Sequence, residues 1–154
     1  MKLTISRGLQ ARCVASALAF FALAGLAVQA AELKYEARLI WATNDKKSPD
    51  SKHKEVDPEI RKKLDTLNLK WANYFEVHRK QFSLAKGAVE KVAMSDKCSI
   101  EVRDVDGKKV EVSLIGKGEQ VWKGTKLLPK GDILVLGGNA PNSTAWLVTL
   151  KRVE

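Results

Sequence analysis

The side chains best suited to bind a metal ion or act as nucleophiles are few in this chain of 154 residues. Beyond the first thirty residues they are His53, His78 and Cys98, and no two stand at a ligand spacing such as H-x-x-x-H or C-x-x-C. Asp104 and Asp106 in "DVDG" match the first positions of a calcium loop, but the downstream ligands are missing, so we interpret the segment as a turn. We therefore expect neither a metal nor another cofactor.

Cys98 is the candidate nucleophile for a small thiol-dependent enzyme, provided that His78 reaches it from another strand. There is no G-x-S-x-G segment, and the acidic residues mostly alternate with apolar ones, as on a solvated strand face. In "CSIEVRDV" the side chains of Ile100 and Val102 share a face with Cys98, which favours a buried small hydrophobe. We accordingly predict that the chain is not an enzyme, with the thiol enzyme as an alternative.

Two glycine-bearing segments, "IGKGEQVWKG" and "LGGNAP", could cradle a phosphate only if a helix followed them, and none is predicted there. Residues 132–150, "DILVLGGNAPNSTAWLVTL", instead predict a closing hairpin. Gly137 and Gly138 would allow a bulge or a positive φ, and Pro141 would stiffen the tip. Substitution of Gly138 by valine is expected to cost stability.

The tryptophans are the remaining candidates for ligand binding. Trp41 and Trp71 fit core positions by their spacing, and Trp146 belongs to the more apolar side of the last strand, which directs it toward the core. Trp122 lies beside Val121, which is the better inward residue. Trp122 is therefore predicted to be the exposed aromatic.

A partner-binding surface could combine Trp122 with His78, Lys46 and Lys47. The first thirty residues hold three basic residues and no acid, so the formal charge of +9 becomes +6 for the rest of the chain. The lysines are scattered, as on a soluble surface, and would suit an anionic envelope component. No nucleic-acid motif is present, so nucleic acid is not an expected partner.

The first thirty residues are typical of a cleaved signal peptide. A basic start precedes an apolar stretch over 13–28, and small residues precede a cleavage point after Ala30. The apolar stretch is shorter than the roughly 20 residues that cross a bilayer, so no transmembrane segment is expected after cleavage. Residues 31–154 would then form a single β-rich domain that is periplasmic or released. Cys98 would be its only cysteine, which rules out an internal disulfide.

The elements that must position these residues are mostly strands. "LKYEARLIWATND" alternates and predicts a half-buried strand, with Leu39 and Trp41 on the core side and Glu36 and Arg38 on the solvent side. "CSIEVRDVDGKKVEVSLIG" predicts a hairpin with a turn of positive φ at Asp106-Gly107. Its inward residues would be Ile100, Val102, Val110, Val112 and Leu114.

One amphipathic helix is predicted in "DPEIRKKLDTLNLKW". Asp57 can cap its free amides and Pro58 suits the first helical position. Its apolar stripe would be Ile60, Leu64, Leu67 and Trp71. With about eight strands in all, we predict a mainly β fold: an antiparallel β sandwich or open barrel with this helix at an edge or open end.

"KLLPKGDILVLGG" resembles the segment near the end of bacterial secretin domains in which a turn leads into a strand that closes in Gly-Gly. The chain lacks the length and the membrane-inserting hairpins of a secretin, so that activity is not implied. More broadly, "RLIWATND", "CSIEV", "LIGKG" and "LVLGG" are similar to segments of a type of small exported bacterial protein without an established function. That resemblance implies no catalytic residues.

These observations favour an exported, non-catalytic β domain that binds a protein partner or an anionic envelope component. A carbohydrate- or peptidoglycan-binding module is the first alternative, and the thiol-dependent enzyme is the second. A surface cluster of Trp122, His78 and lysines would favour the first alternative. An exposed Cys98 within hydrogen-bond reach of His78 would favour the second.

Overall fold

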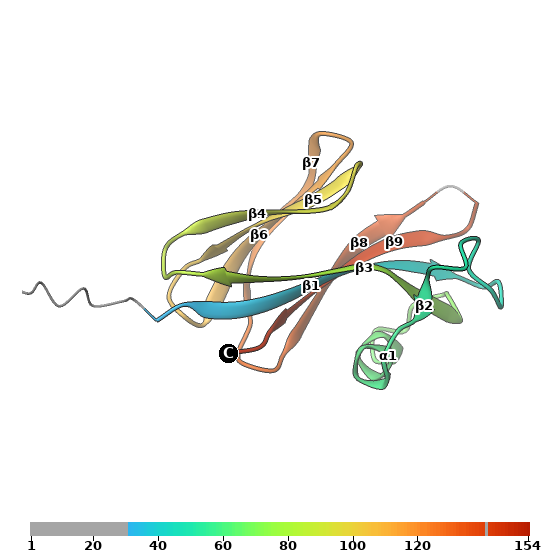
Figure 1. Cartoon of the computed structure of the whole chain (residues 1–154), viewed down its shortest axis with the longest axis horizontal. Coiled ribbons are helices and arrows are strands. Elements are labelled where there is room, and N and C mark those ends of the chain that lie inside the picture. The colour runs from blue at the N-terminus through green and yellow to red at the C-terminus, as the bar shows by residue number, and fades with distance from the viewer. Residues whose placement is uncertain (1–30, 141) are drawn as a thin grey trace, which may run out of the picture.

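The computed structural model describes residues 31–140 and 142–154 (Figure 1). The predicted signal peptide, residues 1–30, and Pro141 lie outside the described residues. The described chain forms two antiparallel sheets, of five and four strands, and one short helix. The predicted mainly β fold with a single helix is thus confirmed, and the two sheets form a sandwich.

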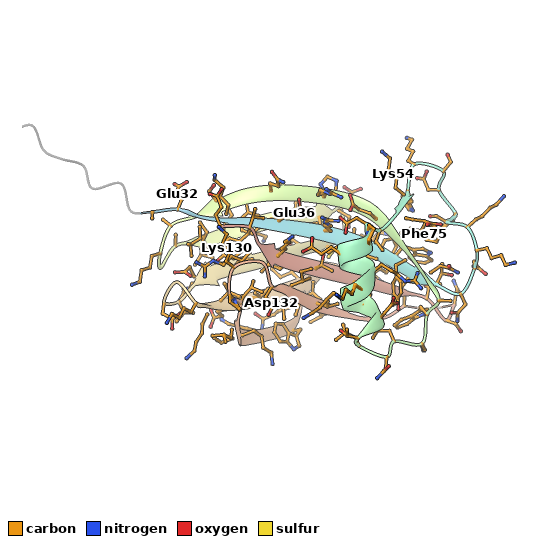
Figure 2. The ribbon with its side chains drawn as sticks, turned by 90° about the horizontal axis from the view of Figure 1, so that it is seen from below. Glu32, Glu36, Lys54, Phe75, Lys130 and Asp132 are labelled. Carbon is orange, nitrogen blue, oxygen red and sulfur yellow. The ribbon has the colours of Figure 1, made fainter. Side chains whose placement is uncertain are left out.

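Sheet A has the strand order β2-β3-β1-β9-β8. Its strands are β1 (Leu33–Thr43), β2 (Lys54–Glu55), β3 (Asn73–Leu84), β8 (Ile133–Asn139) and β9 (Ala145–Arg152). Sheet B is a meander of β4 (Val89–Ser95), β5 (Cys98–Asp104), β6 (Lys109–Gly116) and β7 (Glu119–Leu127). Helix α1 (Pro58–Asp65) lies across the outer face of sheet A, in front of its strands in Figure 2.

Helix α1 begins as predicted. The Asp57 carboxylate accepts a hydrogen bond from the Ile60 N–H at 3.0 Å, and Pro58 occupies the first turn. The helix ends at Asp65, six residues before the end of the predicted apolar stripe, and Asn68 has a left-handed φ of 48°. The prediction that Leu67 continues the buried stripe is therefore wrong.

Trp71 is nevertheless buried, although it lies outside the helix. Its indole Nε1 donates a hydrogen bond of 2.7 Å to the Ser143 carbonyl, which ties the segment after α1 to the β8–β9 turn. The core position predicted for Trp71 is confirmed, but the contact that buries it comes from the far end of the chain.

Strand β1 contributes to two separate cores. Tyr35, Ala37 and Leu39 pack between the sheets, whereas Ile40 and Ala42 pack under α1 on the opposite face of sheet A. The prediction of a half-buried strand is therefore wrong. Residues on both faces of β1 are buried from Tyr35 to Ile40, and a register shift against β3 falls between Leu39 and Ile40.

The predicted β5–β6 hairpin is confirmed, with Ile100 opposite Leu114 and Val102 opposite Val112. Gly107 has the expected positive φ, 79°. Both carboxylates of "DVDG" bind backbone groups of the turn: Asp104 accepts from the Gly107 N–H, and Asp106 accepts from the N–H groups of the two lysines that follow. These side chains stabilise a turn, as the sequence suggested.

The predicted closing hairpin is also confirmed, since β8 pairs with β9 without a register shift. Of the bulge or positive φ predicted for the two glycines, the structure has the positive φ, at Gly137. Gly137 has a φ of 155°, and a Cβ there would lie 2.5 Å from the Trp146 carbonyl oxygen, whereas a Cβ at Gly138 would meet no atom within 4 Å. The structure thus requires glycine at position 137. The loss of stability predicted for substitution of Gly138 is expected at Gly137 instead.

Candidate binding surface

Trp122 is not the most exposed tryptophan of the described residues. It is half-buried on β7 and packs against the core between the sheets, with its ring over Gly124. Val121, predicted to face inward, is 62% exposed. The register shift in the β6–β7 pairing explains this inversion: Leu114 lies opposite Trp122 and Ile115 opposite Gln120, so Val121 is an extra residue that shifts the alternation.

Trp146 is 43% exposed, so the prediction that it packs in the core is wrong. Its strand neighbours on the same face, Val148 and Leu150, do lie in the core between the sheets. The alternation therefore assigns Trp146 to the correct face of β9. Trp146 is exposed because sheet B does not cover the end of sheet A that carries it. Figure 1 shows the β4–β5 and β6–β7 turns directed away from sheet A at this end.

Four laterally paired residues at this end of sheet A form what we call the aromatic row. They are Phe75 on β3, which is buried, Trp41 on β1, Trp146 on β9 and Gly138 on β8. The indoles of Trp41 and Trp146 meet edge to face, with ring centroids 4.6 Å apart. Trp41 is half-buried, which corrects its predicted core position, and open space lies above Gly138 beside the Trp146 strand.

Three other predicted site residues lie at or near this end of sheet A. Lys46 and Lys47 are exposed in the loop that follows β1, and no ion pair engages either of them among the described residues. His78 is exposed on β3, where it pairs with Leu39. Leu39 and Trp41 share a face of β1, so His78 lies next to the pair of Trp41 and Phe75. Trp122 belongs to the other sheet, so it is not part of the aromatic row.

The most concentrated charge lies on the opposite face of sheet A. The Arg38 guanidinium, with 5% of its side chain exposed, forms ion pairs with Glu36, Asp57 and Glu76. Arg79 adds a second cation, 2.8 Å from Glu76. Because Asp57 also caps α1, this cluster fixes the start of the helix to the middle of the sheet.

Two carboxylates of this cluster, Glu36 and Asp57, have lowered pKa values. Burial opposes ionisation of Glu36, but hydrogen bonds from Gln81 and Arg38 outweigh it and lower its pKa. Burial likewise opposes ionisation of Asp57, and the Ile60 N–H and Arg38 outweigh it and lower that pKa. Glu36 and Asp57 therefore have no proton to exchange near neutral pH, and their ion pairs with Arg38 stabilise the fold.

Cys98 and His78 lie on different sheets, and among the described residues no hydrogen bond joins them. Cys98 is half-buried against the core between the sheets. Burial raises the pKa of its thiol, which is opposite to what an activated nucleophile requires.

Ser48, Asp50 and His53 come together in the β1–β2 loop, a cluster that sequence spacing did not reveal. Ser48 Oγ lies 2.6 Å from His53 Nδ1, but the Asp50 carboxylate is 3.9 Å from Nε2, beyond hydrogen-bond length. Ser48 Oγ also accepts from the Asp50 N–H, as in a serine-stabilised turn. The contacts are local to the loop and stabilise its shape.

The described part of the chain offers no set of three or more His, Cys, Asp or Glu side chains placed to hold a metal ion. Two of its hollows have volumes of about 200 and 100 Å³. Phe75 of the aromatic row lines the smaller one, and neither includes Trp41, Trp146 or Cys98. The one described helix is too short and too polar to cross a bilayer.

Fold and surface together define a small antiparallel β-sandwich with a partly exposed tryptophan pair at one end. No family model, curated protein or solved structure matches the chain.

Proposed function

We propose that residues 31–154 form an exported, non-catalytic β domain that binds a protein partner or an anionic envelope component through the aromatic row. The observation that carries the proposal is the exposure of Trp146 beside Trp41 on an uncovered sheet face. Tryptophan is the residue most enriched at the energetic centres of interfaces, because its large rigid ring loses much contact with water on binding.

Export is supported by the sequence alone. The basic start, the apolar stretch and the small residues before position 31 are those of a signal peptide. The charge of +6 on the remaining chain and the unpaired Lys46 and Lys47 near the aromatic row suit a partner with negative charge. A sugar ring would also stack on the Trp146 indole, so a peptidoglycan or other glycan ligand is the second candidate.

The test is capture of partners from a bacterial envelope extract by the immobilised domain 31–154. We expect Trp146→Ala to abolish capture and Trp122→Ala to retain it, since only Trp146 lies in the aromatic row. Trp146→Ala should lower the melting temperature only modestly, because Trp146 belongs to neither buried core and loses chiefly its edge-to-face contact with Trp41. Equal capture by Trp146→Ala and the unchanged domain would refute the proposed surface.

Two further measurements separate the kinds of partner. Loss of capture in Lys46→Ala/Lys47→Ala, together with release by added salt, would indicate an anionic polymer, since exposed charge pairs are screened by salt. Co-sedimentation with purified peptidoglycan that depends on Trp146 but resists salt would favour the glycan. Capture of a single protein that survives digestion of all glycan would identify a protein partner.

A further inference from the structure

Strand β8 is an open edge of sheet A, and it differs from the other edge strands of the two sheets. The described sheets end at β2, β8, β4 and β7. Three of these edges carry charged residues, which discourage pairing with another strand: Lys54 and Glu55 on β2, Glu90 and Lys91 on β4, and Glu119, Lys123 and Lys126 on β7. β8 has the sequence ILVLGGN and no charge between Ile133 and Asn139.

The hydrogen bonds at both ends of the β8–β9 ladder show which backbone groups of β8 are free. The Arg152 N–H donates to the Asp132 carbonyl, and the Ala140 N–H donates to the Thr144 carbonyl. In an antiparallel pair these bonds fall on alternate residues, so the even-numbered residues of β8 bond to β9. The odd-numbered residues, 133, 135, 137 and 139, therefore direct their N–H and C=O groups away from β9, toward the open edge.

This pattern is symmetric about Leu136. If β8 lies antiparallel to β8 of a second copy with Leu136 opposite Leu136, every outward-facing residue meets another outward-facing residue: 133 meets 139 and 135 meets 137. All seven residues of the strand overlap, and no charge meets a like charge. In the same register Leu134 of one copy lies beside Gly138 of the other, where a side chain meets open space.

We propose that two copies of the domain pair through β8 in this register, which joins their five-stranded sheets into one continuous ten-stranded sheet. The pairing obeys two-fold symmetry, the commonest arrangement of homodimers. It also extends the aromatic row: Leu134 of each copy would fill the space beside Trp146 of the other. The occupant of the edge is a second copy because β8 is complementary to itself in length, hydrogen bonding and charge.

The first test removes one outward-facing N–H from the edge. Val135→Pro deletes a donor that β9 does not use. Thr125→Pro is the control for a proline at an outward position, on β7, and Val135→Ala is the control for the packing of Val135 on the core under α1. Light scattering and sedimentation of the domain 31–154 should give a dimer for the unchanged protein and for both controls. Val135→Pro should be a folded monomer by circular dichroism.

A monomeric unchanged domain at the highest soluble concentration would overturn the proposal. So would dimers that survive Val135→Pro or dissociate equally with either control.

A second test does not depend on the folding of the proline variant. In a Cys98→Ser background, Leu136→Cys should form a disulfide-linked dimer under mild oxidation, because the two copies of residue 136 lie opposite each other across a non-hydrogen-bonded pair. Leu134→Cys, which faces Gly138 of the second copy, should cross-link far more slowly. Equal cross-linking of the two variants, or none for Leu136→Cys, would rule out this register. Partner capture through Trp146 is measured separately, so either proposal can fail alone.

Discussion

The two halves of sheet A are buried on opposite faces. The half containing Tyr35 and Leu39 packs against sheet B, whereas the half containing Ile40 and Ala42 packs under α1. The core changes sides near Arg38, where charged side chains fill the space that neither apolar core occupies. In the first half the buried side chains of Glu36 and Arg38 occupy the other face, whereas in the second half the face opposite α1 carries Trp41 and Trp146 and is only partly covered.

This difference shows that alternation along a strand assigns residues to faces but not to burial. Leu39 and Trp41 share a face of β1, yet Leu39 is buried and Trp41 is only half-buried, because sheet B ends between them. Glu36 and Arg38 share the other face and are both buried, although their polarity predicted exposure. Whether a strand residue is buried depends on which other segments, distant in the sequence, pack over it.

The largest loss of stability is expected at Arg38, which lies on β1 between the core that faces sheet B and the core under α1. Arg38→Met keeps the length of the side chain but removes the buried cation from Glu36, Asp57 and Glu76, which leaves them only the more exposed Arg79. We expect a loss of about 3–5 kcal/mol in the free energy of unfolding, measured by urea denaturation. The control, Lys91→Met, removes an exposed ion pair with Glu101 and should cost less than about 0.5 kcal/mol. Similar costs for the two variants would show that the buried cluster does not brace the fold.

Two adjacent residues of β1 test the burial of both faces. Leu39→Ala opens a cavity between the sheets, and Ile40→Ala opens one under α1, so each should cost about 2–5 kcal/mol in the same assay. A half-buried strand would instead make one of the two substitutions nearly neutral. That result would contradict the double-sided packing.

The adjacent glycines of β8 should respond differently to one methyl group. Gly137→Ala places a Cβ against the Trp146 carbonyl at a positive φ and should cost about 1–3 kcal/mol. Gly138→Ala meets open space and should change stability by less than about 0.5 kcal/mol. Thermal melts of both variants measure the difference, and a larger loss at Gly138 would mean that β8 lies differently against β9.

The dependence of stability on pH is expected to be the smallest effect. Glu36 and Asp57 have lowered pKa values in the folded protein, so their ionised forms stabilise it. That contribution is complete above their ordinary pKa values of 4.5 and 3.8 and is lost as the pH falls through the lower folded values. The melting temperature should therefore decrease below about pH 4. Arg38→Met should show a smaller decrease, and an equal decrease would assign the acid sensitivity to other groups.

Much of the local structure could be predicted because its causes are local. Asp57 and Pro58 mark the start of α1, and Gly107 marks a turn of positive φ, through the backbone preferences of those residues. The β5–β6 and β8–β9 hairpins follow from alternating runs on either side of turn residues. The end of α1 was missed, because Leu67 and Trp71 continue a helical spacing that the chain abandons at the left-handed Asn68.

The candidate surface was predicted only in part. His78, Lys46 and Lys47 do lie at or near the end of sheet A that carries the aromatic row, but the expected aromatic was Trp122 and the exposed one is Trp146. Two non-local features caused the error. One extra residue in β7 reverses the alternation around Val121, and sheet B stops short of Trp146.

By itself the sequence determined the β-rich class, the hairpins, the helix start and the side of each strand on which its residues fall, because these depend on neighbours a few positions apart. The tertiary structure decided which of those sides are covered. Coverage depends on where α1 and sheet B lie, and therefore on contacts between segments far apart in the chain. For that reason the buried ion cluster around Arg38 and the exposed Trp41–Trp146 pair emerge only from the folded arrangement.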